Sequence, residues 1–449
     1  MKPNRLFVQV CALSGLVLST LGAATADAQA TTYSLTDIGA IPAGFSGYMM
    51  SAPTGINNNG QVVGSNQFHT LFYDKGVVTD LGTLPGGVVS QGLAINSFGD
   101  VSAASQYDSD NGAIFHAALF GIDGSKVNLG VLIGWGTYSY GYGINDSKQV
   151  VGSSGFAAPS TSTHAFIWDA SNGLLDLGTL GGQYAQARSV NNAGLVTGTS
   201  QIPTGFGPFH AFLWDKINGM RDIGAIAGDS SAGVFINQNG HAVGNSTINT
   251  FDNRTHAFLY DGAMHDLGSL GAGSTMSDIS SAYSVNIHDD VVGSTYRPFA
   301  GGSLYQTAYI YHAGVMSELE KLVDGSGADY RLLTATGIND MGQIVAQATQ
   351  VSSGQTHAVL LTPTATATDT VTITGATYTK RRKSLQVLAT DSSKRATLQV
   401  FVTSTDTLIG SLAKKGRGYS GTFIVSSNPV SITVKSSLGG SATATVTTK

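Results

Sequence analysis

Short apolar runs separated by turn-forming residues recur along most of the chain and predict β-strands rather than helices. A representative stretch holds four such runs, at residues 139–144, 149–154, 164–169 and 174–180. Each run is too short for a typical helix and is bounded by Gly, Asn, Ser or Asp, as short strands usually are. Gly contributes 58 residues and Pro only 10, so the pattern indicates many tight turns in an ordered all-β chain.

An apolar residue followed by Asn marks the same point of each unit and recurs seven times. Successive copies lie 39 to 53 residues apart, which matches the length of one four-stranded propeller blade. Asn side chains bond nearby backbone groups and Gly tolerates positive φ, so the Asn and the Gly that often follows it predict a tight turn. The seven residues are Asn57, Asn96, Asn145, Asn191, Asn237, Asn286 and Asn339.

Two further markers follow each Asn. The first is a strand that begins His-Ala-Phe or a variant of it, and the sixth copy has Thr307 in place of His. The second is an Asp-Leu-Gly step, with Asn128 and Glu318 at the degenerate copies. We expect each His to bond within its own blade, because residues one blade apart are too distant to share a metal ion. They are His69, His116, His164, His210, His256 and His357.

The last unit lacks its Asp-Leu-Gly strand, and a matching strand stands at the start of the repeats, at residues 33–39. This first strand would complete the last blade and remove an exposed sheet edge. An open solenoid is the alternative, but its repeats usually need roughly 20–30 residues and it gives the first strand no role. The sequence therefore predicts a seven-bladed β-propeller over residues 31–363, closed by its N-terminal strand.

With these motifs the chain resembles the HAF-repeat family of secreted bacterial repeat proteins. The likeness rests on the His-Ala-Phe runs, the Asp-Leu-Gly steps and the Ile-Asn pairs followed by Val-Val-Gly, and it covers about residues 31–363. It implies export and a β-propeller-like repeat architecture, but no chemistry, because the family carries no established activity. Thr307 and Glu318 depart from the pattern and mark the sixth unit as the least regular.

Residues 1–30 have the pattern of a secretory signal peptide. A basic start precedes an apolar run that ends near Leu21, and Ala28-Gln-Ala30 suits a cleavage site. A transmembrane anchor is the alternative, but a span needs roughly 20 apolar residues. We therefore expect a secreted, extracellular protein, with the periplasm or cell surface left open and no membrane span after cleavage. The single Cys, Cys11, lies in this segment, so the mature chain would have no disulfide.

Residues 364–370 form a Thr-Ala linker, and residues 371–449 hold roughly seven short alternating runs, which predicts a small Ig-like β-sandwich. The charge changes sign between the two domains. Residues 364–449 carry 11 Lys and Arg against 3 Asp and Glu, whereas residues 31–363 carry 10 against 24. This asymmetry favours an anionic surface as partner of the C-terminal domain, or contact between the domains. For the basic cluster at residues 380–383, a solvated turn is the alternative.

The strand before each Asn is expected to be the innermost strand of its blade and to line the central channel. These seven segments hold no carboxylate and no His, and Arg188 is their only charged residue. General acid–base catalysis needs a titratable group within reach of the substrate, so this composition argues against a hydrolase in the channel. No nucleic-acid-binding motif is present in the sequence.

The loops between second and third strands are long and should emerge on the same face as the blade-to-blade loops, which makes this face the candidate binding surface. One blade-to-blade segment carries Trp135, Tyr138, Tyr140 and Tyr142. Aromatic rings in such a position stack on sugars or bury a partner, and ordinary packing between blades is the alternative.

Three successive loops each present a carboxylate a few residues before the Asn of the next blade, at Asp229, Asp278 and Asp329. If these loops converge, the three groups would form a Ca²⁺ site, and solvated loop charge is the alternative. No other cofactor is expected.

These observations favour a secreted, non-enzymatic protein that binds a glycan or an envelope or extracellular protein through the long-loop face. The alternative is an extracellular propeller enzyme, a glycan hydrolase or lyase, with a loop-borne and Ca²⁺-supported site. An envelope scaffold without a small ligand is a third interpretation.

Overall fold

A computed structural model of the chain describes residues 31–39, 50, 52–66, 68–107, 114–132, 136–156, 162–203, 207–251, 254–271, 277–298, 304–364, 370–392, 396–405, 407–416, 418–436 and 440–449. They fall in two compact units, Thr31–Ala367 and the chain from Thr368 onward. The described residues also include the short 3₁₀ helices η2 (Leu319–Leu322), η3 (Gly325–Gly327) and η4 (Lys380–Arg382). Within the described part of the chain, no helix has the length and hydropathy to cross a membrane. The proposed signal peptide, residues 1–30, lies outside it.

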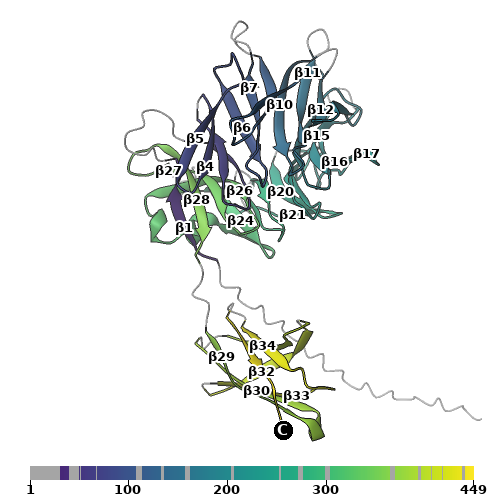
Figure 1. The fold of residues 1–449 in the computed structure, drawn as a ribbon. Coiled ribbons are helices and arrows are strands. Elements are labelled where there is room, and N and C mark those ends of the chain that lie inside the picture. The colour runs from purple at the N-terminus through teal and green to yellow at the C-terminus, as the bar shows by residue number, and fades with distance from the viewer. Residues whose placement is uncertain are drawn as a thin grey trace, which may run out of the picture. The chain divides into compact units, whose positions relative to one another are not determined.

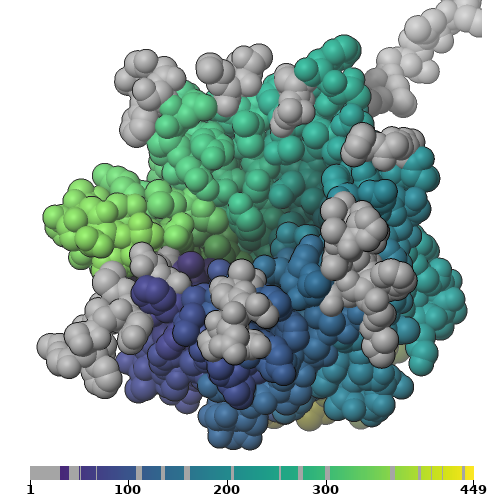
Figure 2. Space-filling model, turned by 90° about the horizontal axis from the view of Figure 1, so that it is seen from above, coloured from purple at the N-terminus to yellow at the C-terminus, as the bar shows by residue number. Residues whose placement is uncertain are grey.

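Seven antiparallel four-stranded sheets form the first unit and follow one another around a ring (Figures 1 and 2). Blades 1 to 3 consist of β2 (Ala52–Ile56), β3 (Val62–Ser65), β4 (Thr70–Asp74), β5 (Val77–Gly82); β6 (Ser90–Ile95), β7 (Val101–Gln106), β8 (Phe115–Phe120), β9 (Lys126–Gly130); and β10 (Gly136–Ile144), β11 (Val150–Phe156), β12 (Thr163–Asp169), β13 (Gly173–Gly178). Blades 4 to 6 consist of β14 (Ala185–Val190), β15 (Val196–Gln201), β16 (Phe209–Asp215), β17 (Gly219–Asp222); β18 (Ser231–Ile236), β19 (Ala242–Thr247), β20 (Thr255–Tyr260), β21 (Met264–Asp266); and β22 (Ser280–Val285), β23 (Val291–Pro298), β24 (Leu304–His312), β25 (Val315–Glu318).

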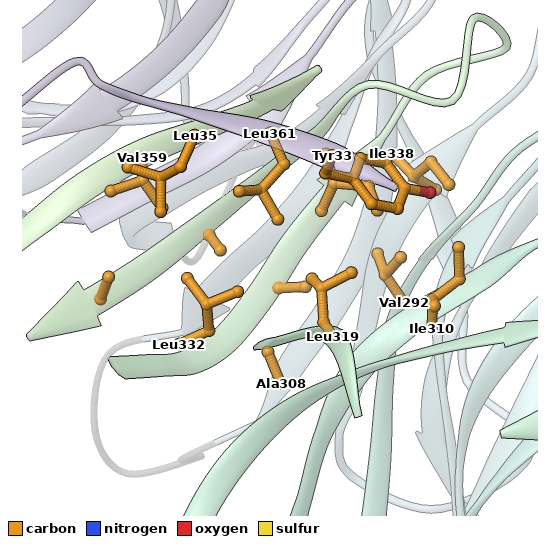
Figure 3. Close-up of a cluster of buried hydrophobic side chains, with 14 residues drawn as sticks. Tyr33, Leu35, Val292, Ala308, Ile310, Leu319, Leu332, Ile338, Val359 and Leu361 are labelled. Carbon is orange, nitrogen blue, oxygen red and sulfur yellow. The ribbon is translucent and has the colours of Figure 1, made fainter. Parts of the chain in front are cut away.

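The seventh blade joins the two ends of the propeller. Its strands are β26 (Tyr330–Ile338), β27 (Ile344–Gln350), β28 (Thr356–Pro363) and, outermost, β1 (Tyr33–Asp37). Strand β1 pairs antiparallel with β28, from Tyr33 opposite Pro363 to Asp37 opposite Val359. Figure 3 shows Tyr33 and Leu35 beside Val359 and Leu361 in one buried cluster. The predicted seven-bladed propeller closed by its first strand is therefore confirmed.

A steric fit between neighbouring strands couples two of the repeated motifs. In blade 3, Gly152 of the Val-Val-Gly run lies opposite Phe166 of the His-Ala-Phe run. A Cβ at Gly152 would lie 2.6 Å from the ring of Phe166 and 1.8 Å from the carbonyl oxygen of Tyr140, so only Gly fits there. The same pairing recurs at Gly198 with Phe212, Gly244 with Phe258 and Gly293 with Tyr309. Each of these aromatic rings is fully buried, which explains why the two motifs occur together.

The second unit consists of eight strands: β29 (Val371–Thr379), β30 (Ser384–Asp391), β31 (Leu398–Val402), β32 (Thr407–Lys415), β33 (Gly418–Ile424), β34 (Ser431–Ser436), β35 (Ser441–Thr445) and β36 (Thr447–Thr448). They pair in one continuous order, β35-β34-β31-β32-β33-β30-β29-β36, and β29 also contacts β34 and β35. The sheet is therefore nearly closed around a core that includes Val387, Val400 and Val434.

The prediction of a small all-β C-terminal domain is confirmed, and its strands form one nearly closed sheet rather than two unconnected layers. Strand β32 alternates weakly, because Leu412 is its only buried residue. Binding of an anionic surface by this unit stays a prediction.

Candidate binding channel

Every blade carries a β-bulge at the same point of its innermost strand. The innermost strands β2, β6, β10, β14, β18, β22 and β26 contact one another around the axis. In each of them the pairing register shifts three residues before the repeated Asn, so that one residue is left without a partner. A bulge re-aims the side chain that it carries. The seven residues at these bulges, which we call the bulge ring, are Thr54, Leu93, Tyr142, Arg188, Val234, Tyr283 and Thr336.

The bulge ring lines a cavity of about 440 Å³ that all seven innermost strands enclose. The cavity reaches the Asn turns, where Asn58, Asp146 and Asp340 also line it. Sequence reasoning expected the innermost strands to line a central channel in which Arg188 is the only charged residue, but it placed binding on the opposite, long-loop face. One signal in the sequence pointed to the bulge ring. The residue three positions before each repeated Asn differs widely in chemistry from blade to blade, whereas the Asn is the same in all seven.

The predicted aromatic residues connect the long-loop end of β10 to this cavity. Tyr142 belongs to the bulge ring, and Tyr140 stacks on it with ring centroids 6.0 Å apart and an interplanar angle of 6°. Tyr138 meets Tyr140 edge to face at 6.0 Å and reaches Thr163, where the two hydroxyls lie 3.2 Å apart. Trp135 lies outside the described residues. The tyrosines therefore form a ladder, of which Tyr140 and Tyr142 are half-buried and Tyr138 is exposed.

Arg188 stands next to this ladder on the neighbouring blade. Its guanidinium carbon lies 4.4 Å from the centroid of the Tyr142 ring, a cation–π contact. Arg188 is exposed to the channel and is the only charged member of the bulge ring. The tyrosine ladder supplies aromatic surface, and the guanidinium beside it supplies a planar set of hydrogen-bond donors.

The repeated Asn residues form a closed circle of hydrogen bonds around the channel mouth. Each Nδ2 donates to the backbone carbonyl of the next repeated Asn, and Asn339 donates back to Asn57 at 3.0 Å. Each Oδ1 accepts backbone N–H groups two and four residues ahead, as in the turn of Asn191. All seven are buried. The expected turn role is present, and the donation from blade to blade adds a second role that sequence reasoning did not find.

The repeated His residues bond within their own blades, as expected. Nδ1 of His164 lies 2.8 Å from Oδ2 of Asp176, which belongs to the Asp-Leu-Gly step on the adjacent strand. In blade 7 the same pair spans the closure, with His357 Nδ1 2.7 Å from Asp37 Oδ2. Equivalent contacts join His69 with Asp80, His116 with Asn128, His210 with Asp222 and His256 with Asp266. Blade 6 lacks both partners, because Thr307 and Glu318 replace them together.

The three loop carboxylates do not come together. Asp278 accepts from Arg254, His256 and Ser269, and Asp329 accepts from the hydroxyl of Ser352. Asp229 is exposed. In the described ranges no group of three or more His, Cys, Asp or Glu side chains is placed to hold a metal ion. The Ca²⁺ site therefore stays a prediction that this geometry does not favour.

His256 lies between two carboxylates, and the three groups shift one another's pKa. Burial alone lowers the pKa of His256, but the hydrogen bonds and charges of Asp266 and Asp278 outweigh burial and raise it above its ordinary value of 6.5. Burial alone would raise the pKa of both carboxyl groups. Hydrogen bonds and the charges around them outweigh it and lower both below 3.8.

We predict that His256→Gln destabilises the propeller most between about pH 4 and pH 6.5. The raised pKa of His256 stabilises the folded chain fully below its unfolded pKa, and this contribution is lost as the pH rises through the folded pKa. The contribution of the two carboxylates is lost as the pH falls below about 3.8. Urea unfolding at pH 5.5 and pH 8.5 measures the difference. His265→Gln, an exposed His paired with Asp261, is the control and should show little change at either pH.

A family model described as "Protein of unknown function (DUF3466)" matches residues 88–397. No curated protein matches the sequence. Similar solved structures include a prolyl endopeptidase (13% identity, 80% of this chain and 55% of that chain, TM-score 0.40). They also include a puromycin-hydrolyzing peptidase of Mycobacterium tuberculosis (12%, 68% and 52%, 0.41) and the β-propeller domain of the Trilobed protease from Pyrococcus furiosus (12%, 66% and 87%, 0.36). The chain spans about half the length of the two peptidases, and these likenesses carry no argument about activity.

Proposed function

The chain belongs to the DUF3466 family, whose function is unknown, and from that premise we propose that it is an extracellular, non-enzymatic protein that binds a glycan in its propeller channel. The observation that carries the proposal is the tyrosine ladder from Tyr138 to Tyr142, which leads from the long-loop face to the bulge ring. Aromatic faces provide broad apolar contact for sugar rings, and a cavity lined by a few polar groups fixes their orientation.

The chemistry of the bulge ring supports binding rather than turnover. Its seven side chains comprise two Thr, two Tyr, one Leu, one Val and one Arg. Thr and Tyr hydroxyls and the guanidinium supply hydrogen bonds to a saccharide, whereas glycoside hydrolysis commonly needs a pair of carboxyl groups beside the scissile bond. We propose further that the units are HAF-type repeats. The His–Asp contact and the Gly–Phe fit give the His and the Phe of that motif structural roles within the blade.

A saccharide panel tests the proposal with the chain of residues 31–449. We expect binding of at least one oligosaccharide class, without release of products, and a loss of about tenfold in affinity for Tyr140→Ala or Tyr142→Ala, or about 1.4 kcal/mol. Phe251→Ala is the matched control, because Phe251 is 97% exposed on blade 5 and belongs to neither the ladder nor the bulge ring. Cleavage of any bound saccharide, or equal affinity of the ladder variants and wild type, contradicts the proposal.

A further inference from the structure

We propose that the bulge ring recognises a carboxylate and that the glycan is an acidic saccharide, with Arg188 as the residue that selects it. This inference rests on the proposed function, because it names the class of ligand for the same channel. The propeller sequence is strongly acidic, yet its channel presents the cationic side chain of Arg188.

Arg188 differs from the other arginines of the propeller. Arg221 pairs with Asp215, Arg254 with Asp278, Arg297 with Glu318 and Arg331 with Glu320, with N–O distances of 2.7 to 3.3 Å. Among the described residues, Arg188 has no carboxylate within salt-bridge distance. Neutral residues occupy the equivalent position in the six other blades, whereas blade 4 places a guanidinium there without an ionic partner among the described residues.

The contact with Tyr142 positions the guanidinium of Arg188 to bind a planar anion. The guanidinium carbon of Arg188 lies over the ring of Tyr142, and a guanidinium in a cation–π contact still has N–H groups that can donate to a ligand. Two parallel hydrogen bonds from such an edge to a carboxylate are strong and geometrically specific. Tyr140 stacks on both Tyr142 and Phe115, so the ladder continues away from Arg188 and its faces are largely used within the protein. A sugar lying along the edges of the ladder would bring a carboxylate substituent toward Arg188.

Carboxylates of the protein also line the cavity, and they are already bonded. Asp146 accepts from the backbone of Ser97 and from the side chain of Asn192. Asp340 accepts from the backbone of Ile287 and from the side chain of Asn58. Both follow the repeated Asn directly and belong to the channel mouth, whereas Arg188 precedes its Asn by three residues. The mouth is therefore acidic and the bulge ring carries the cation, so we expect one carboxylate, not a densely charged polyanion, to be accepted.

The experiment compares uronate-containing oligosaccharides with their methyl esters, which keep the sugar and remove the charge. Isothermal titration uses the chain of residues 31–449, with Arg188→Gln, Arg188→Lys and, as matched control from the same blade, Arg221→Gln. We expect wild type and the control to bind an acid at least tenfold more tightly than its ester. Arg188→Gln should bind the acid and the ester equally. Arg188→Lys should retain part of the preference for the acid, since Lys keeps the positive charge but lacks the two parallel N–H donors of the guanidinium.

The outcomes separate this inference from the proposed function. If esters bind wild type as tightly as acids, or if Arg188→Gln keeps the preference, the channel binds glycans but Arg188 does not select a carboxylate. If no saccharide of either kind binds, both proposals fail. Thermal unfolding of each variant checks that the fold is intact, and little change is expected because Arg188 is exposed and forms no ion pair with a described residue.

Discussion

Leu35→Asp is expected to destabilise the propeller by more than about 4 kcal/mol, enough to prevent ring closure in much of the population. Leu35 is buried in β1 against Val359, Leu361 and Leu332 in the cluster of Figure 3. The substitution removes its apolar contacts and places a carboxylate in a core where, among the described residues of that cluster, no charged side chain faces it. Urea unfolding monitored by tryptophan fluorescence and circular dichroism measures the change.

The neighbouring residue supplies a matched control for this prediction. Thr36 lies on the opposite face of the same strand and is exposed. Thr36→Asp introduces the same charge one residue away, and an exposed substitution of this kind usually changes stability by less than about 0.5 kcal/mol. Similar losses for the two variants would mean that the burial of β1 contributes little and that the ring stays closed without it.

Asn191→Ala is expected to cost about 3 kcal/mol, because the change breaks the circle of buried hydrogen bonds at one blade. The amide donates to the carbonyl of Asn237 at 3.1 Å, and its oxygen accepts the N–H groups of Ala193 and Leu195. Removal leaves the partly buried N–H groups of Ala193 and Leu195 without their acceptor, and the buried carbonyl of Asn237 keeps only the N–H of Gly240. Each unsatisfied group costs about 1–3 kcal/mol before relaxation or water entry. Denaturant unfolding of the purified variant provides the value.

The variant Asn192→Ala is the control that shows whether the loss for Asn191→Ala comes from burial or only from the number of hydrogen bonds removed. It is exposed, donates to Asp146 at 2.7 Å and accepts the backbone N–H of the same residue. Asn192→Ala also removes two hydrogen bonds between blades, but water can replace them, so we expect a loss below about 1 kcal/mol. If both variants lose the same amount, the circle stabilises the ring no more than surface contacts do.

Local patterns predicted the blades because each strand is a short run bounded by turn residues and pairs within its own sheet, and second strands such as β3 are apolar or small and buried throughout. The missing strand of the last unit also revealed the closure, since residues 33–39 and the region of His357 carry complementary halves of the His–Asp motif. By contrast, the hydrogen bond from each repeated Asn to the carbonyl of the next one joins residues 39 or more positions apart, so no local sequence pattern predicts it.

The bulge ring escaped prediction for a different reason. A bulge inserts one residue into an otherwise alternating strand, and the sequence of Tyr140 to Ile144 reads the same with or without it. Only the pairing with β11 shows that Tyr142 has no partner and enters the cavity. Tyr140 and Tyr142 were therefore found through their aromatic character and their place on a strand expected to line the channel, whereas the bulge at Tyr142 was not predicted.

The pairing of β1 with β28 also decides how the propeller would respond to tension. The chain enters and leaves the ring at one point, because the backbone N–H of Thr364 donates to the carbonyl of Thr32 at 2.8 Å and Tyr33 faces Pro363. Tension applied between Thr32 and Thr364 would therefore separate β1 from β28 one hydrogen-bonded pair at a time, starting from this end. The other six blades would carry none of the load until β1 had peeled away.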